Sequence, residues 1–167
     1  YQALVDSSAS VRWLCWPRFD SSFVFGSLID EACGGEFSVH LAESTSSQRY
    51  LPDSAVVETV LRRGKDAVEV LDFAPRNSDG VRPRRFLRRL RSRSGRPESR
   101  LVCRPVYDYG RAPMPPGVFH FQCSLAGAVA QADQSVVLED DVYLAVSWGE
   151  PVVGDLCEYG DTALRET

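Results

Sequence analysis

A cluster of aromatic and charged residues near the start of the chain has the residue types that a binding surface needs. Residues 13–21 read WLCWPRFDS, so two tryptophans, a phenylalanine, an arginine and an aspartate fall close together. Flat aromatic faces beside a guanidinium and a carboxylate suit either a sugar or a docking domain. The same residues can instead plug one end of a β-sandwich, because buried aromatic side chains are commoner than functional ones. The sequence therefore predicts a candidate surface comprising Trp16, Arg18, Phe19 and Asp20.

Two later clusters combine aromatic residues, arginine and turn formers in the same way. Residues 104–111 read RPVYDYGR, and residues 48–52 read QRYLP. Tyrosine and arginine each offer a flat face and hydrogen bonds, so loops of this kind that meet at one edge would form a carbohydrate-binding or protein-docking surface. The alternative is that these tyrosines are half-buried residues at strand ends. From the first of the two segments, Tyr107, Tyr109 and Arg111 join the candidate surface.

The carboxylates do not form a recognisable catalytic pair. Glycoside hydrolysis needs an acid and a base, or an acid and a nucleophile, at a defined separation. Asp20, Asp72 and Asp108 are the candidates, together with three consecutive acids at 139–141, which are typical of a solvated turn before a strand. The sequence also lacks a glycine-rich phosphate loop, a Gly-x-Ser-x-Gly elbow and a His-Glu-x-x-His motif. We therefore expect no catalytic residue in this chain.

The cysteines and histidines give little support for a metal site or a cofactor. The five cysteines are odd in number and widely spaced, without a Cys-x-x-Cys pair, and we expect buried, reduced thiols. The two histidines, His40 and His120, are far apart in sequence. A zinc site or a Cys/His nucleophile pair would need the fold to assemble it from distant segments. We predict no metal ion and no cofactor.

Charge is distributed unevenly along a chain whose formal net charge is −4. Ten of the nineteen basic residues lie between Arg82 and Arg104, where Glu98 is the only acid. Such asymmetry indicates an anionic partner or a partner domain with an acidic surface. The arginines also alternate with apolar residues, as they would on solvated strand faces, and the chain as a whole is acidic, which argues against nucleic-acid binding.

Short segments rich in Val, Leu, Phe and Tyr recur along the 167 residues and are separated by Gly, Ser, Asp and Pro. This pattern predicts an all-β fold, a two-sheet antiparallel β-sandwich (supersandwich). A chain of this length buries enough surface to sustain its own core as one domain. The strands are expected at Ala3–Val5, Val11–Cys15, Glu36–Ala42, Ala55–Arg62, Ala67–Phe73, Arg84–Arg91, Arg100–Tyr107, Val118–Leu125, Ser135–Leu138 and Val142–Ser147.

Turn residues and caps suggest how these strands are connected. The turns at 63–66 (RGKD) and 94–97 (SGRP) predict two hairpins. Ser21 or Ser22 can cap one short helix over Phe23–Ile29, which the glycines at 34 and 35 would end. Asp161 begins a second capped segment at the end of the sequence, which predicts the start of a longer helix.

Four of these motifs occur together in a known family. The segments WLCWPRFDS (13–21), RYLP (49–52) with VET (57–59), LDFAP (71–75) and RPVYDYGR (104–111) resemble, in order and spacing, the N-terminal domain of glycoside hydrolase family 15. That family contains bacterial and archaeal glucoamylase-like and trehalase-like proteins. The resemblance covers most of the chain.

The resemblance implies an N-terminal β-sandwich domain over residues 1–158. Residues 159–167 would begin a linker helix to an (α/α)6 catalytic domain that is absent here. This barrel would be the partner in the same parent chain and would carry the catalytic glutamates of an inverting hydrolase, so we expect the present chain to be inactive alone. The candidate surface would pack on the barrel and help to shape its pocket for an α-glucoside sugar.

Two other functions remain open at this stage. The chain could be an independent carbohydrate-binding module, or an interaction domain that binds an anion through an arginine-rich hairpin at 84–104. No run of about 18 apolar residues is present, so we expect no membrane partner. We also expect no nucleic-acid partner and a cytoplasmic location.

Overall fold

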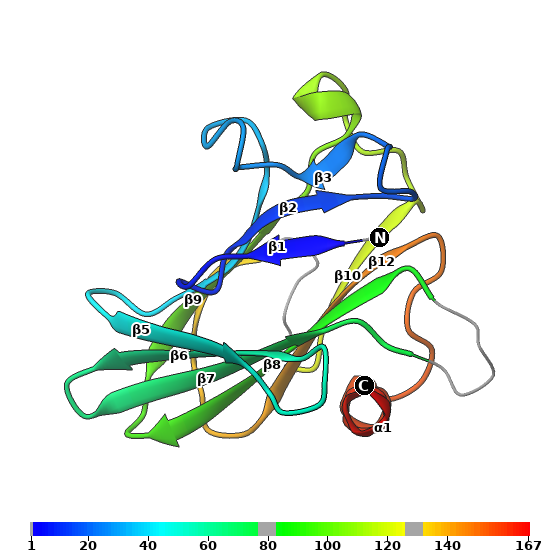
Figure 1. Cartoon of the computed structure of the whole chain (residues 1–167). Coiled ribbons are helices and arrows are strands. Elements are labelled where there is room, and N and C mark those ends of the chain that lie inside the picture. Colours follow the sequence, from blue (N-terminus) through cyan, green and yellow to red (C-terminus); the bar gives the residue numbers. More distant parts are fainter. Residues whose placement is uncertain (1, 77–82, 126–131) are drawn as a thin grey trace.

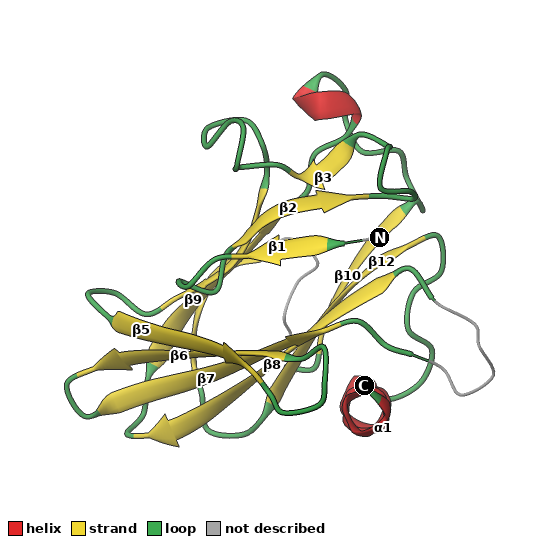
Figure 2. Ribbon diagram, viewed as in Figure 1, coloured by secondary structure: helices red, strands yellow, loops and turns green. Residues whose placement is uncertain are grey.

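The computed structural model describes residues 2–76, 83–125 and 132–167, and three antiparallel sheets form its body (Figures 1 and 2). The largest sheet has six strands in the order β10-β12-β8-β7-β6-β5. Its strands are β5 (Thr45–Tyr50), β6 (Val57–Arg63), β7 (Asp66–Phe73), β8 (Arg85–Ser94), β10 (Phe119–Cys123) and β12 (Val142–Trp148). The two smaller sheets are formed by β1 (Ala3–Val5), β2 (Val11–Cys15) and β3 (Phe23–Phe25), and by β4 (Glu36–His40), β9 (Glu98–Arg104) and β11 (Ala132–Val137).

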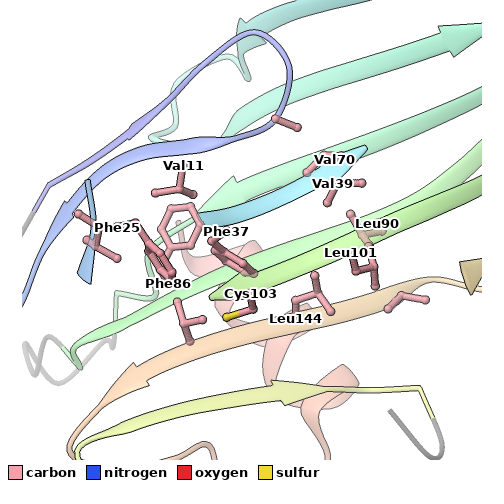
Figure 3. Packing of buried hydrophobic residues seen from close by; sticks show 14 of the residues in the cluster. Val11, Phe25, Phe37, Val39, Val70, Phe86, Leu90, Leu101, Cys103 and Leu144 are labelled. Carbon is pink, nitrogen blue, oxygen red and sulfur yellow. The ribbon is translucent and has the colours of Figure 1, made fainter. Parts of the chain in front are cut away.

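The main core lies between the six-stranded sheet and the two small sheets. Alternate residues of β7 and β8, such as Val70 and Leu90, face Phe25, Phe37 and Leu101 from the small sheets (Figure 3). The small sheets are joined to each other at one bridge between Ser10 and Ser38. The expected all-β antiparallel sandwich is therefore confirmed, with one of its two layers divided into two three-stranded sheets.

The six-stranded sheet is also apolar on half of its outer face. Leu71, Phe73, Leu87 and Tyr143 point away from the main core and pack against helix α1 (Leu156–Glu166). Strand β7 is buried from Ala67 to Phe73, and five of these seven residues are apolar.

Several local predictions need correction. The expected helix over Phe23–Ile29 is wrong: Phe23–Phe25 is strand β3, which pairs with β2 and buries all three of its residues. The six residues of β5 were not predicted as a strand, because every one is exposed and none of the first four is apolar. The hairpin at 63–66 is confirmed by the pairing of β6 with β7.

The second predicted hairpin, at 94–97, is wrong. Strand β8 already pairs with β7 on one side and β12 on the other, so it has no free edge for β9. Strand β9 instead pairs with β4 and β11 in a small sheet. The turn at Gly95 therefore carries the chain from one layer to the other.

Helix α1 begins earlier than predicted. Its N-cap is Asp155, whose side chain accepts a hydrogen bond from the Glu158 backbone N–H at 2.8 Å, whereas Asp161 lies inside the helix. The expected domain boundary between residues 158 and 159 falls within this helix, and its role as a linker stays a prediction. In the part of the chain that the structure describes, no helix has the length and apolar character needed to cross a membrane.

Specific contacts fix α1 on the outer face of the sheet. The Tyr143 hydroxyl donates a hydrogen bond to Asp161 at 2.5 Å, and Arg85 donates to the Tyr159 hydroxyl at 3.0 Å. The pKa of the Tyr143 hydroxyl is raised, mainly because the group is buried and in second place because of this hydrogen bond to Asp161. Gly160 lies directly over the Tyr143 ring, where a Cβ atom would come within 2.4 Å of ring carbons.

We expect Gly160→Ala to destabilise the chain although alanine is the better helix former by about 1 kcal/mol. The added methyl group overlaps the Tyr143 ring, so the helix must move off the sheet. Overpacking of this kind costs about 1–3 kcal/mol. Urea denaturation would measure the change, with Thr162→Ala on the exposed side of the same helix as the control. A Gly160→Ala protein as stable as the control variant would contradict this account of the docking.

Candidate docking surface

Trp16 belongs to the core rather than to an exposed surface. Its side chain is 1% exposed, and its ring lies 6.4 Å from that of Phe119 and 6.5 Å from that of Trp148, measured between centroids. Trp16 therefore closes one end of the sandwich, as expected from the alternative that these aromatic residues are part of the core. Trp16 lies beneath the loop that follows it in the sequence. Its side chain is too buried to line a surface.

The three residues that follow Pro17 lie on an exposed loop. The Arg18 guanidinium binds both carboxylate oxygens of Asp20, with Nε and one terminal nitrogen at 3.0 and 2.8 Å. Phe19, between them, is 78% exposed. The loop thus presents an apolar ring beside a neutralised ion pair, which suits a surface that another molecule covers.

Tyr107, Tyr109 and Arg111 are held around the short 3₁₀ turn η1 (Asp108–Gly110). The Tyr107 ring stacks on Trp148 with centroids 6.4 Å apart. The Tyr109 ring packs edge-on against Phe23 at 5.4 Å, and the Arg111 guanidinium lies 5.9 Å from the Tyr109 ring centroid. Tyr109 nevertheless stays half exposed.

Backbone conformation at this turn is costly for the residues that occupy it. Asp108 and Tyr109 have φ values of 47° and 56°, in the left-handed region that non-glycine residues rarely adopt. Such conformations cost about 1–3 kcal/mol each and cluster at functional sites. The Tyr109 side chain is thus held half exposed by a backbone conformation that most residues avoid.

Trp148 joins the two predicted clusters, and sequence reasoning missed it. Both Trp16 and Tyr107 contact its ring, so the loop after β2 and the turn η1 meet through this residue. The available signal was a tryptophan placed directly after the strand predicted to end at Ser147.

Leu28 and Ile29 were also missed, because they were assigned to a helix. They follow β3 and are 59% and 70% exposed. The loops after β2 and β3 and the turn η1 border the β1-β2-β3 sheet in the upper part of Figure 1, where the loop after β2 lies on the right and the loop after β3 on the left. We call the exposed residues in and beside these three segments the loop-end surface, and its members are Arg18, Phe19, Asp20, Leu28, Ile29, Tyr109 and Arg111.

The third predicted cluster does not join this surface. Arg49 and Tyr50 lie on β5, the edge strand at the opposite end of the molecule in Figure 1. Arg49 donates from Nε to Glu58 at 2.5 Å, and Tyr50 lines a shallow groove between β5 and β1.

Three of the carboxylates considered for catalysis form ion pairs with arginines. Asp72 is 2% exposed and forms a bidentate ion pair with buried Arg88. Asp20 pairs with Arg18 as described above, and Asp141 pairs with Arg91 at 2.8 and 2.6 Å. None of these arrangements leaves two carboxylates facing one open site.

Histidines and cysteines are likewise dispersed. His40 contacts Glu36 on β4, whereas both close contacts of the His120 Nε2 atom are backbone carbonyl oxygens. The expectation of buried thiols holds for Cys15 and Cys103, where burial raises the pKa and keeps the thiols protonated and unreactive. It is wrong for Cys33, which is exposed. Among the described residues no three His, Cys, Asp or Glu side chains are grouped as metal ligands.

The arginine-rich run does not form one surface. Arg88 is in the core, Arg89 and Arg91 lie on the outer face of the six-stranded sheet, and Arg100 and Arg104 belong to β9 in a small sheet. The anion-binding hairpin expected at 84–104 therefore does not exist as a unit, because its two strands lie in different sheets.

A cavity beside β9 and β10 has none of the loop-end residues in its lining. It has a volume of about 770 Å³ and includes none of the seven residues predicted for the candidate surface. Its lining combines prolines at 105, 115, 116 and 151 with Met114, Phe119, Phe121, Arg104, His120 and Asp133.

Comparison with known proteins places the chain in a family. The family described as "Trehalase-like, N-terminal" matches residues 1–132. The trehalase of Mycolicibacterium smegmatis is 32% identical over 128 residues, and Trehalase 1 of Sulfolobus acidocaldarius is 34% identical over 110 residues; each alignment covers 65% of this chain. The trehalase of Mycobacterium tuberculosis is 27% identical over 190 residues, covering 87% of this chain.

These alignments cover 19%, 18% and 28% of the three relatives, respectively, so the chain corresponds to a small part of each. No solved structure matches it. The family match covers well over half of the chain and agrees with the aromatic and arginine motifs from which the resemblance was drawn. The chain therefore belongs to the trehalase-like N-terminal family.

Proposed function

We propose that this chain is a noncatalytic N-terminal domain of a trehalase-like hydrolase of glycoside hydrolase family 15. In this proposal it packs through the loop-end surface on an (α/α)6 catalytic domain of the same cytoplasmic polypeptide. The observation that carries the proposal is the exposure of Phe19, Leu28, Ile29 and Tyr109 on segments that border the β1-β2-β3 sheet, in a chain that matches a small part of longer trehalases.

The chemistry of the loop-end surface supports docking. Four large apolar side chains, each more than half exposed, are an unfavourable arrangement unless a partner covers them. The ion pair between Arg18 and Asp20 and the stacking of Arg111 near Tyr109 place polar groups beside the apolar ones. An apolar centre with polar neighbours is typical of domain interfaces.

The sugar-facing part of the proposal rests on Tyr109 and Arg111. A tyrosine ring offers a flat face to a sugar ring, and a guanidinium donates to hydroxyl groups. The strained backbone that holds Tyr109 outward is consistent with a contact to the catalytic pocket or to its α-glucoside substrate. We propose that this turn forms part of the pocket rim.

The test replaces Phe19 and Tyr109 by alanine together in the full-length polypeptide. We expect the double variant to lower kcat/KM for trehalose by about tenfold or more, because interface anchors contribute about 1–2 kcal/mol each. We also expect a lower melting temperature, because the contact between domains is weakened. Trehalose hydrolysis and calorimetry measure the two effects.

Val153→Ala is the matched control, since Val153 is an 88% exposed apolar residue outside the loop-end surface. If the double variant retains the stability and turnover of this control, the docking proposal fails. Saturable binding of trehalose to the 167-residue chain alone would instead support an independent carbohydrate-binding module.

A further inference from the structure

The outer face of the six-stranded sheet has a second half that α1 does not cover. There the outward positions of β5, β6 and β8 carry arginines, whereas the carboxylates lie beneath them. We call this region the basic face, and its charged members are Arg49, Arg62, Arg89, Arg91, Arg93, Glu58, Glu69 and Asp141.

The carboxylates of the basic face are covered by guanidinium groups. The side chains of Glu58 and Glu69 are 6% and 8% exposed. Arg49 and Arg93 both pair with Glu58, and Arg93 and Arg89 both pair with Glu69. The hydrogen bond from Arg49 is the main cause of a lowered pKa at Glu58, so this carboxylate is ionised at neutral pH.

The arginines keep unused donors on the solvent side. Arg49, which is 65% exposed, donates to Glu58 only from Nε, so its two terminal nitrogens stay available. Arg91, 49% exposed, uses Nε and one terminal nitrogen on Asp141. Arg62 is exposed, and no partner for its side chain occurs among the residues described.

Charge and shape together indicate the kind of partner. Five guanidiniums against three carboxylates leave a formal surplus of two positive charges, although the whole chain carries −4. Arg49 and Arg62 lie on the neighbouring strands β5 and β6. Arg89, Arg91 and Arg93 follow alternate positions of β8, about 6.8 Å apart, with β7 between β6 and β8. A flat array of this kind meets several separate carboxylates, whereas a single small anion would need an enclosing pocket.

We propose that the basic face binds an acidic protein surface, with the arginines of β5, β6 and β8 pairing with carboxylates of the partner. This contact is separate from the loop-end surface and stands independently of the function proposed above.

The test measures binding of a fluorescein-labelled oligoglutamate peptide of about 12 residues to the chain by fluorescence anisotropy. We expect binding at low ionic strength that weakens steeply between about 50 and 200 mM salt, because charged contacts on an exposed face are screened. Arg49→Ser combined with Arg62→Ser should weaken binding about tenfold or more.

The control is Arg84→Ser combined with Arg165→Ser, which removes the same charge at two exposed positions outside the basic face. Circular dichroism checks that both double variants are folded. Equal loss of affinity in the two double variants would overturn the proposal, as would the absence of peptide binding by the unmodified chain. Displacement of the peptide by low millimolar inorganic phosphate, or tighter binding of a single-stranded oligonucleotide, would also overturn it, by identifying a different ligand.

Discussion

Arg88→Met should lower the free energy of unfolding by about 3–5 kcal/mol at pH 8, because it leaves a buried carboxylate without its partner. Arg88 is fully buried, and its Nε and terminal nitrogen donate to the two oxygens of Asp72 at 2.6 and 3.1 Å. The guanidinium also lies 4.7 Å from the ring centroid of Phe37. The pair thus connects the six-stranded sheet with β4 of the opposite layer.

The effect should depend on pH in a defined direction. Burial raises the pKa of the Asp72 carboxyl, and the Arg88 guanidinium opposes this shift. Without Arg88, ionisation of Asp72 occurs in the unfolded chain at a lower pH than in the folded chain. Stability of the variant is therefore lost as pH rises from the unfolded pKa, near 3.9, towards the raised folded value.

Urea denaturation at pH 5 and pH 8 measures both the size and the direction. Arg91→Met is the control, because its ion pair with Asp141 is partly exposed and contributes about 1 kcal/mol or less. The double variant Asp72→Leu with Arg88→Met should recover much of the lost stability, since no buried charge remains. An Arg88→Met protein no less stable than the Arg91→Met control would disprove the role assigned to this pair.

Asp72 also illustrates what the sequence could and could not provide. Its carboxylate was one of the candidates for catalysis, and nothing in LDFAP indicates that the partner is an arginine sixteen positions later. The alternation of β6 and β7 and the turn between them were readable, because a hairpin depends on local residues. The path from β8 to β9 has an equally good turn, but its outcome depends on β12, which occupies the edge that β9 would need.

The same distinction applies to the candidate surface. The residue types of WLCWPRFDS and RPVYDYGR identified the loops that meet through Trp148. The exposure of each aromatic ring could not be predicted from the sequence, because it depends on which side of the loop the ring faces. Leu28 and Ile29 were missed for a related reason, since a helix and an exposed loop after a short strand share the same turn residues.

Trp16 and Phe19 provide the strongest test of this assignment, because they lie three positions apart with opposite exposure. Trp16→Ala should lower the free energy of unfolding by about 3–5 kcal/mol, since it empties a site packed against Phe119 and Trp148. Phe19→Ala should change it by about 0.5 kcal/mol or less, because its ring is 78% exposed. Chemical denaturation of the chain measures both.

The two variants also separate core packing from docking. In the full-length polypeptide, Phe19→Ala should reduce stability or turnover although it leaves the 167-residue chain almost unchanged, because the ring acquires neighbours only when the loop-end surface is covered. Trp16→Ala should destabilise both forms. A Phe19→Ala variant that is silent in both would remove Phe19 from the proposed interface, and a Trp16→Ala variant of normal stability would contradict the burial of Trp16. The two variants therefore test whether the Trp16 ring serves the core of the sandwich while the Phe19 ring is available to a partner.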